Sequence, residues 1–324
     1  MDGEKAANIW ELGLQIASKK KDEPLAQRTL QFIGSRQSGK TSLVYRFVDK
    51  SDNPKPTLAL EYVFARKKRT NEVGKDVCDI WELGGENLFT NLLQFSITKE
   101  NISTVSVVLV LNLAVPEEIV LTAESLIDSV KERINDVIGM SKLAKELKQK
   151  AAQRFGQKHR DLDRVDPFPI PLLIVGSKYD LFEELDLEKR KVISSYLRLL
   201  AHLNGASLLY VTTKSEALVN KMKTMFSHLA FDSSSPTATV TDHNKPLFVP
   251  FGADSFESIG QEVIEFAKNE LLSLCPQKTT KVVIPDDPAA DPNFRERDID
   301  LIYSQKRREL DEYKRQLELK SSMQ

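Results

Sequence analysis

The sequence has little cysteine, no long apolar run and almost no net charge. Its two cysteines, Cys78 and Cys275, are far apart in the 324 residues, and neither belongs to a CxxC or Cys/His group. A disulfide framework and a structural zinc site are therefore not expected. No stretch reaches the roughly 18 apolar residues of a membrane span, and acids and lysines interrupt the start, so we expect neither membrane insertion nor secretion. With 46 basic against 47 acidic residues, charge-driven binding of nucleic acid is not expected either.

From residue 29 onward, short apolar runs alternate with longer amphipathic stretches. The runs at 105–113 and 171–176 are apolar without alternation, which is typical of buried parallel strands. The runs at 58–65 and 77–83 flank the basic turn 66–74 and predict an antiparallel hairpin. Further strands are predicted at 29–33, 207–211 and 246–250, and helices at 40–49, 116–153, 187–203, 215–229 and 255–274. This pattern predicts an α/β protein with a doubly wound, mostly parallel sheet and a charged helical insertion at 142–164.

The chain is predicted to have three parts: an N-terminal helix and linker (1–28), the α/β domain (29–275), and a linker followed by a C-terminal helix (276–324). Trp10, Leu14 and Ala17 form the apolar stripe of the first helix, which we expect to pack on the domain. The last helix either packs back or docks on a partner, and docking is favoured because the domain looks complete without it. Its expected docking residues are Ile299, Ile302, Leu310, Tyr313 and Leu317.

The segment 34–41 (GSRQSGKT) matches the phosphate-binding pattern GxxxxGK[ST], after a predicted strand and at the start of a predicted helix. We call this segment the phosphate loop. Glycines in such a loop let backbone N–H groups surround phosphate oxygens at the positive end of the helix dipole. Lys40 would neutralise phosphate charge, and the Thr41 hydroxyl would bind Mg²⁺. The alternative is a glycine-containing turn that binds nothing. The predicted phosphate-binding residues are Gly34, Ser35, Ser38, Gly39, Lys40 and Thr41.

The nucleotide base would be read by loops that follow two later strands. Residues 176–180 (GSKYD) resemble the NKxD element of GTP-binding proteins, with Ser177 in place of Asn. Asp180 is then placed to accept the guanine N1 and N2 hydrogens, and Lys178 to cover the ring. Because Ser177 is shorter than Asn, we expect it to lose some bonds that tie this loop to the phosphate loop. Thr213 and Lys214 stand in the place of the SAK element, so a guanine nucleotide, GTP or GDP with Mg²⁺, is the expected ligand.

Two positions that are important for GTP hydrolysis in GTPases carry different residues in this chain. In the segment 81–86 (WELGGE), Glu82 and Gly85 occupy the ends of a DxxG element, so Glu82 replaces the Asp that holds Mg²⁺ through water. Glu86 stands where GTPases carry a water-positioning Gln, and an ionised carboxylate only accepts hydrogen bonds and repels the γ-phosphate. We therefore expect no efficient hydrolysis and no catalytic residue. Thr57 is either the switch threonine that closes over Mg²⁺ or a turn residue after two prolines.

Taken together, the segments 54–67, 80–88, 171–210, 212–218, 250–260 and 287–294 resemble the dynein light intermediate chains. The likeness is strongest to the branch of that family that serves cytoplasmic dynein-2, the motor of retrograde intraflagellar transport in cilia. Members of the cargo-dynein branch carry a long C-terminal extension, whereas this chain ends soon after its last predicted helix.

That resemblance implies a Ras-like P-loop fold in a non-catalytic subunit. Such a subunit would bind the tail of the dynein-2 heavy chain, assemble with the other dynein-2 subunits and act on microtubules only indirectly. It also implies a location in the cytoplasm and in the cilium, at the axoneme and basal body. The alternative function is a regulatory GTPase whose nucleotide state switches partner binding.

Overall fold

The computed structural model describes residues 27–68, 75–139, 141–234, 236–260, 264–278 and 295–321. The chain divides into two compact units, one up to Thr280 and one from Lys281. The predicted N-terminal helix with Trp10, Leu14 and Ala17 lies outside the described residues, as does most of the predicted linker before the last helix.

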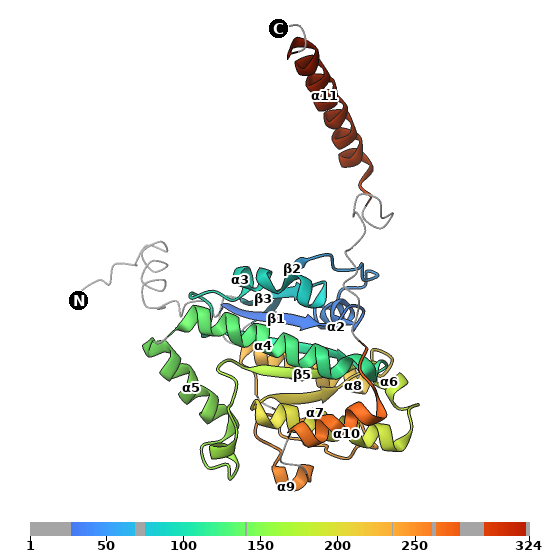
Figure 1. Ribbon diagram of the computed structural model, residues 1–324. Coiled ribbons are helices and arrows are strands. Elements are labelled where there is room, and N and C mark those ends of the chain that lie inside the picture. The colour runs from blue at the N-terminus through green and yellow to red at the C-terminus, as the bar shows by residue number, and fades with distance from the viewer. Residues whose placement is uncertain are drawn as a thin grey trace, which may run out of the picture. The chain divides into compact units, whose positions relative to one another are not determined.

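A seven-stranded mixed sheet forms the centre of the first unit (Figure 1), in the order β2-β3-β1-β4-β5-β6-β7. The inner strands β3, β1, β4, β5 and β6 are parallel, while β2 pairs antiparallel with β3, and β7 antiparallel with β6. The strands are β1 (Gln27–Gly34), β2 (Leu60–Lys68), β3 (Lys75–Leu83), β4 (Val105–Asn112), β5 (Leu172–Ser177), β6 (Ser207–Tyr210) and β7 (Phe248–Val249). The predicted doubly wound, mostly parallel sheet and the predicted hairpin are confirmed.

The two apolar runs without alternation are buried strands, as expected. Every residue of β4 and of β5 is buried. Helix α4 packs on β4 and β1 and crosses in front of the sheet in Figure 1, whereas α8 packs on β1 and β3 together with α2. Strands covered by helices carry apolar residues on both faces, which explains the continuous apolar runs.

Helices connect the strands at or near the expected places. They are α2 (Lys40–Phe47), α3 (Leu93–Ser96), α4 (Ile119–Ile138), α5 (Lys142–Phe155), α6 (Tyr179–Phe182), α7 (Leu187–Leu203), α8 (Glu216–Phe231), α9 (Phe256–Ile259) and α10 (Ile264–Leu274). Short 3₁₀ turns are η1 (Glu86–Leu92), η2 (Pro116–Glu118) and η3 (Leu162–Arg164). Within the described residues, no helix has the length and apolar character needed to cross a membrane.

Two of the predicted helices are each broken by a glycine. The prediction of one helix over 116–153 was wrong, because Gly139 ends α4 with φ at 49° and a separate helix, α5, begins at Lys142. The prediction of one helix over 255–274 was also wrong, because Gly260 ends α9 with φ at 73°. Glycine adopts positive φ without the steric cost of a Cβ, so it commonly follows the last residue of a helix.

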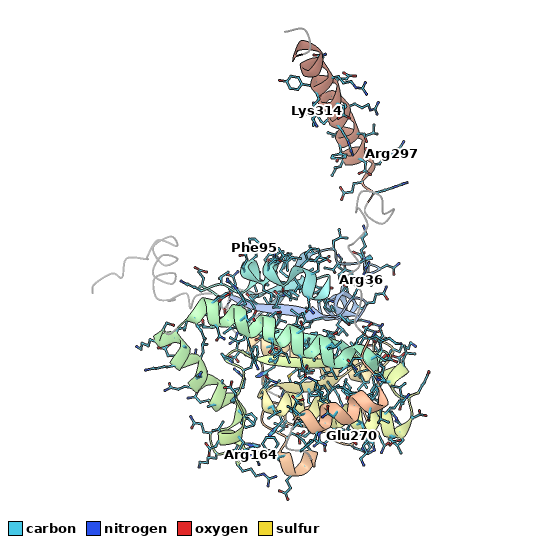
Figure 2. All side chains as sticks on the ribbon, in the orientation of Figure 1. Arg36, Phe95, Arg164, Glu270, Arg297 and Lys314 are labelled. Carbon is cyan, nitrogen blue, oxygen red and sulfur yellow. The ribbon has the colours of Figure 1, made fainter. Side chains whose placement is uncertain are left out.

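The second unit contains one described helix, α11 (Arg297–Ser321), in the place where the sequence predicts it. Figure 2 shows its side chains extending around the whole helix, among them Arg297 and Lys314. Of the expected docking residues, Ile299, Ile302, Leu310 and Tyr313 are each more than half exposed. The side chain of Leu317 lies outside the described residues.

Candidate nucleotide-binding site

The segment 34–41 joins the carboxyl end of β1 to the N-terminus of α2, as the motif requires. A Cβ at Gly34 would lie 2.1 Å from the carbonyl oxygen of Val110 on the neighbouring strand, so only glycine fits there. Gly39 precedes α2 with φ at 88°, which again favours glycine. Ser35 and Ser38 are buried, and the Ser38 hydroxyl is a buried polar atom with no hydrogen-bond partner among the described residues.

Lys40 is buried at the start of α2, with 5% of its surface exposed. Its ammonium donates to the carbonyl oxygens of Gly34 (3.0 Å) and Ser35 (2.9 Å), so its stem folds back over the loop. The charge of Lys40 acts on the neighbouring Glu82 carboxyl, and a phosphate held by the same loop would be a further partner for the ammonium.

Four oxygen-bearing side chains gather beside Lys40, from α2, the loop before β2, and the β2–β3 hairpin. The Thr41 hydroxyl lies 2.8 Å from Glu82 Oε1, and the Thr57 hydroxyl lies 2.9 Å from the same atom. The two hydroxyl oxygens are 3.3 Å apart, and Thr57 also lies 3.1 Å from Glu61 Oε2. Thr57 therefore lies beside Thr41 at the start of α2, and its role as a switch threonine stays a prediction.

Glu82 is the buried carboxylate of this group. Burial raises the pKa of its carboxyl, while the charge of Lys40 and the hydroxyls of Thr41 and Thr57 act to lower it. Next to it, Gly84 N–H donates to Ala59 O at 2.7 Å. A Cβ at Gly84 would approach Thr57 O to 2.6 Å, so this glycine allows the loop carrying Thr57 to approach β3 closely.

Gly85 adopts φ at 68° and begins the 3₁₀ turn η1. A Cβ there would lie 2.6 Å from the ring of Phe89, a residue of the same turn. The side chain of Glu86 lies outside the described residues. The prediction that Glu86 faces a γ-phosphate therefore stays a prediction.

The proposed base-reading residues lie at the ends of β5 and β6. Ser177 is the last residue of β5, and its hydroxyl lies 2.6 Å from Ser38 O in the phosphate loop and 3.0 Å from Leu111 O. Ser177 thus keeps one contact with the phosphate loop, and the expectation that it makes fewer such bonds than an Asn stays a prediction. Lys178 has φ at 57° and precedes α6, where it lies partly buried.

Asp180 is held by two donors from the β6–α8 loop. Lys214 Nζ lies 2.6 Å from Oδ2, and the Thr212 hydroxyl donates to Oδ1 at 2.7 Å. The hydrogen bond from Lys214 is the largest of the effects that lower the pKa of Asp180. The carbonyl of Thr213 accepts a 3.1 Å hydrogen bond from Arg46 of α2. The two base loops are thus linked to each other and to α2, and the Asp180 carboxylate stays ionised and able to accept further hydrogen bonds.

Sequence reasoning missed Glu61 and Arg46 as members of this site. Glu61 pairs directly with Glu82 across the β2–β3 ladder. A predicted hairpin could have suggested such a pair, but not its register, because a shift of one residue moves every side chain to the other face.

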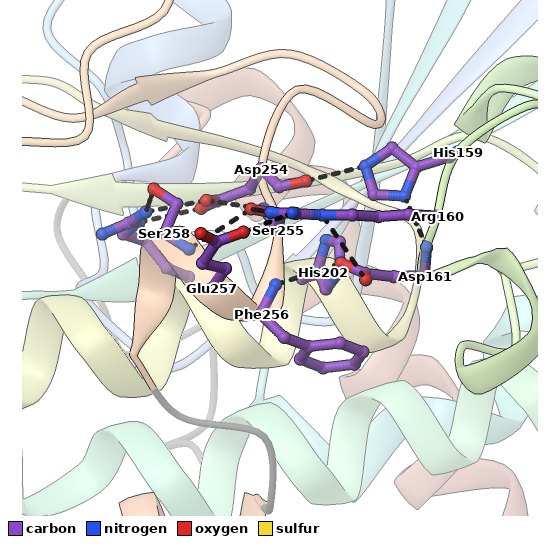
Figure 3. Close-up of polar contacts among 10 residues, drawn as sticks. His159, Arg160, Asp161, His202, Asp254, Ser255, Phe256, Glu257 and Ser258 are labelled. Carbon is purple, nitrogen blue, oxygen red and sulfur yellow. Dashed lines mark hydrogen bonds and ion pairs between the residues drawn. The ribbon is translucent and has the colours of Figure 1, made fainter.

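A second polar cluster lies away from the phosphate loop (Figure 3), where it ties the segment after α5 to α7 and α9. His159 and His202 lie close together in this cluster, with their ring centres 5.5 Å apart. His202 Nε2 lies 2.9 Å from Asp161 Oδ2, and Asp161 also accepts from Phe256 N at 3.0 Å. Burial lowers the pKa of His202, and Asp161 acts against that shift. In the part of the chain that the structure describes, no group of three or more His, Cys, Asp or Glu side chains is arranged to hold a metal ion.

The edge strand β2 exposes aromatic side chains that sequence reasoning did not single out. Tyr62 and Phe64 are 48% and 44% exposed, and they alternate with the partly or fully buried Val63 and Ala65. The ring of Tyr62 lies 4.9 Å from that of Trp81 on β3, and Arg66 lies over the ring of Phe64. This strand was predicted, but its position at the edge of the sheet depends on long-range pairing that the sequence does not show.

The sheet order, the glycine-bearing loop between β1 and α2, and the two loops that meet it define a Ras-like P-loop α/β domain. A family model described as dynein light intermediate chain matches residues 4–170. Cytoplasmic dynein 2 light intermediate chain 1 of Danio rerio is 40% identical over 309 residues, which cover 90% of this chain and 86% of that protein. Its Homo sapiens counterpart is 38% identical over 311 residues, which cover 90% and 88%. The chain belongs to the dynein light intermediate chain family.

Solved structures support the fold. The crystal structure of the dynein light intermediate chain's conserved domain superimposes with a TM-score of 0.58 and 16% sequence identity, covering 80% of this chain and 96% of that one. At that identity, the likeness shows the shared fold.

Proposed function

We propose that this chain is a non-catalytic subunit of the dynein-2 motor that binds the heavy-chain tail and supports retrograde intraflagellar transport and cilium assembly. The observation that carries the proposal is the 36–40% identity, over most of the chain, to proteins named cytoplasmic dynein 2 light intermediate chain 1. The proposed location follows from the same names: the cytoplasm, and the cilium with its axoneme and basal body.

The exposed apolar face of α11 is the proposed docking surface for the heavy chain. Ile299, Ile302, Leu310 and Tyr313 recur at helical spacing, and each is 51–61% exposed. An apolar stripe along a helix otherwise rich in charged residues is typical of a helix that lies in a partner's groove. Helical partners are the natural occupants of such a stripe, since apolar side chains at this spacing interdigitate with those of a second helix.

A guanine nucleotide with Mg²⁺ is proposed as a structural ligand of the first unit. The residues fit it: Gly34 leaves no room for a side chain, the buried Ser38 hydroxyl has no partner among the described residues, and Thr41 and Thr57 offer hydroxyl oxygens, which suit Mg²⁺. Lys40 would bind phosphate, and Asp180 would accept the guanine hydrogens. When bound, Mg²⁺ would neutralise phosphate charge.

A regulatory GTPase is the second candidate, because Thr57 lies against Thr41 where a switch threonine would meet the metal. Against it stands Glu82, whose Oε1 already contacts both hydroxyls. A hydroxyl held by a protein carboxylate is less sensitive to the presence of a γ-phosphate. The structural role is therefore favoured.

The first test is to denature the purified full chain and identify any released nucleotide by chromatography, with a single-turnover GTP assay on the native protein. We expect guanine nucleotide, and a rate far below the roughly 5–20 s⁻¹ of a GAP-stimulated small GTPase. Turnover near that rate would refute the non-catalytic role. Release of adenine nucleotide would refute the assignment of Asp180 to guanine.

A further inference from the structure

Two carboxylates face each other beside the phosphate loop. Glu61 on β2 and Glu82 on β3 are directly paired residues of the antiparallel ladder, and each lies within hydrogen-bond distance of the Thr57 hydroxyl. Like charges directly opposite on two strands destabilise a sheet. Only 5% of Glu82 is exposed, so water does little to screen its charge. The charge of Lys40 acts on Glu82, but one cation balances only one of the two carboxylates, so the arrangement suits a further positive charge close to these oxygens.

The two threonine hydroxyls have too few hydrogens to form a hydrogen bond at every close oxygen–oxygen contact beside the phosphate loop. Four pairs of oxygens approach closely: Thr41–Glu82 at 2.8 Å, Thr57–Glu82 at 2.9 Å, Thr57–Glu61 at 3.1 Å and Thr41–Thr57 at 3.3 Å. Each threonine hydroxyl has one hydrogen, and an ionised carboxylate has none. When both carboxylates are ionised, two hydrogens serve only two of the four pairs, and the other two pairs bring bare oxygens together. A cation bound between the oxygens would remove that repulsion.

The separations of three of these oxygens also suit magnesium. Mg²⁺ holds oxygen ligands octahedrally at about 2.0–2.1 Å, which places neighbouring ligands about 2.9 Å apart. The Thr41, Thr57 and Glu82 oxygens are separated by 2.8, 2.9 and 3.3 Å. The geometry points to Glu82 as a direct ligand of a divalent cation, together with Thr41 and Thr57, with the Glu61 carboxylate beside it.

The length of the side chain at residue 82 explains the difference from the usual arrangement. An Asp at the end of this strand reaches the metal through a water molecule, whereas the extra methylene of Glu82 brings its Oε1 into contact with both threonine hydroxyls. The residue that looks like a degenerate hydrolysis position is then a metal ligand. This inference rests on the proposed Mg²⁺ and nucleotide site, but it concerns the protein's own oxygens.

Mn²⁺ is the probe, since it takes the same oxygen ligands as Mg²⁺ and its free form is measured by electron paramagnetic resonance. The full chain is stripped with EDTA and titrated with Mn²⁺, with and without added GDP. We expect one site. Glu82→Gln removes the charge at equal size, and Thr57→Val removes the hydroxyl at similar shape. Each should weaken Mn²⁺ binding about tenfold or more.

Glu132→Gln is the matched control, because it removes an exposed carboxylate on α4 and should leave Mn²⁺ binding unchanged. Circular dichroism confirms that each variant is folded. Thr57→Val keeps the test decisive if Glu82→Gln does not fold.

Two results would overturn the inference. One is equal Mn²⁺ affinity in wild type, Glu82→Gln and Thr57→Val. The other is a wild-type chain that binds no Mn²⁺, either with or without GDP. Nucleotide is measured on the same samples, so a chain that binds Mn²⁺ through Glu82 but holds no nucleotide would refute the proposed nucleotide and leave this inference standing.

Discussion

Arg198 on α7 shows how a single charged side chain can hold three segments together. Its guanidinium makes a two-point contact with Asp254, at 2.8 and 2.7 Å, and also donates to the Ser258 hydroxyl at 2.8 Å. The side chains of Arg198 and Asp254 are only 10% and 4% exposed. Removing one partner of a buried pair leaves the other charge without compensation, which costs much more than the pair itself contributes.

The variant Arg198→Met should therefore lower the free energy of unfolding by about 3–5 kcal/mol, since it leaves Asp254 buried without its cation. Urea denaturation, followed by circular dichroism, measures the change. Arg160→Met is the matched control: Arg160 contacts Glu257 in the same cluster, but the two side chains are 56% and 78% exposed. That variant should cost no more than about 1 kcal/mol. Equal losses in the two variants would contradict the assigned role of burial.

At the scale of elements, the sequence predicted the central strands because burial on both faces leaves a plain signature, the continuous apolar runs of β4 and β5. The prediction of single helices failed at Gly139 and Gly260, because each glycine ends a helix while the apolar spacing continues on both sides. The phosphate loop was predictable because its backbone geometry demands glycine at fixed positions. The position of Glu61 was not predictable, because it depends on strand register. The His159–His202 pair was not predictable either, because it depends on the packing of distant segments.

The apolar stripe of α11 leads to a prediction about one helix. Leu310→Asp places a charge in the stripe and should weaken binding of the heavy-chain tail about tenfold or more, because burying one such side chain contributes about 1.5–3 kcal/mol. Leu310 is 51% exposed in the chain itself, so the melting temperature should change little. Ser304→Asp adds the same charge on the opposite side of α11 and should leave binding intact. Binding is measured by co-precipitation and calorimetry with a purified tail fragment.

Unchanged binding in Leu310→Asp would show that the heavy chain does not use this stripe. A large fall in melting temperature would show that the stripe is part of a folded core.

At the scale of the whole molecule, the candidate nucleotide site and the candidate docking helix belong to separate units of the chain. Residues up to Thr280 carry the phosphate loop, the base loops and the core, and residues from Lys281 carry α11. The contacts of Lys40 with Gly34 and Ser35 are internal to the first unit. If the nucleotide is structural, nucleotide binding and heavy-chain binding should be separable by mutation. If the chain is a regulatory GTPase, the two should be lost together.

Lys40→Ala tests that separation. It removes the ammonium that would face the phosphates, so nucleotide affinity should fall sharply, while tail binding should stay within about twofold of wild type, a difference of roughly 0.4 kcal/mol. Leu310→Asp should do the reverse, keeping nucleotide and losing the tail. Both variants are compared with wild type for bound nucleotide and for co-precipitation with the heavy-chain tail, after circular dichroism has confirmed folding. A folded Lys40→Ala chain that no longer binds the tail would favour the regulatory GTPase, since occupancy of the phosphate loop would then control the docking surface.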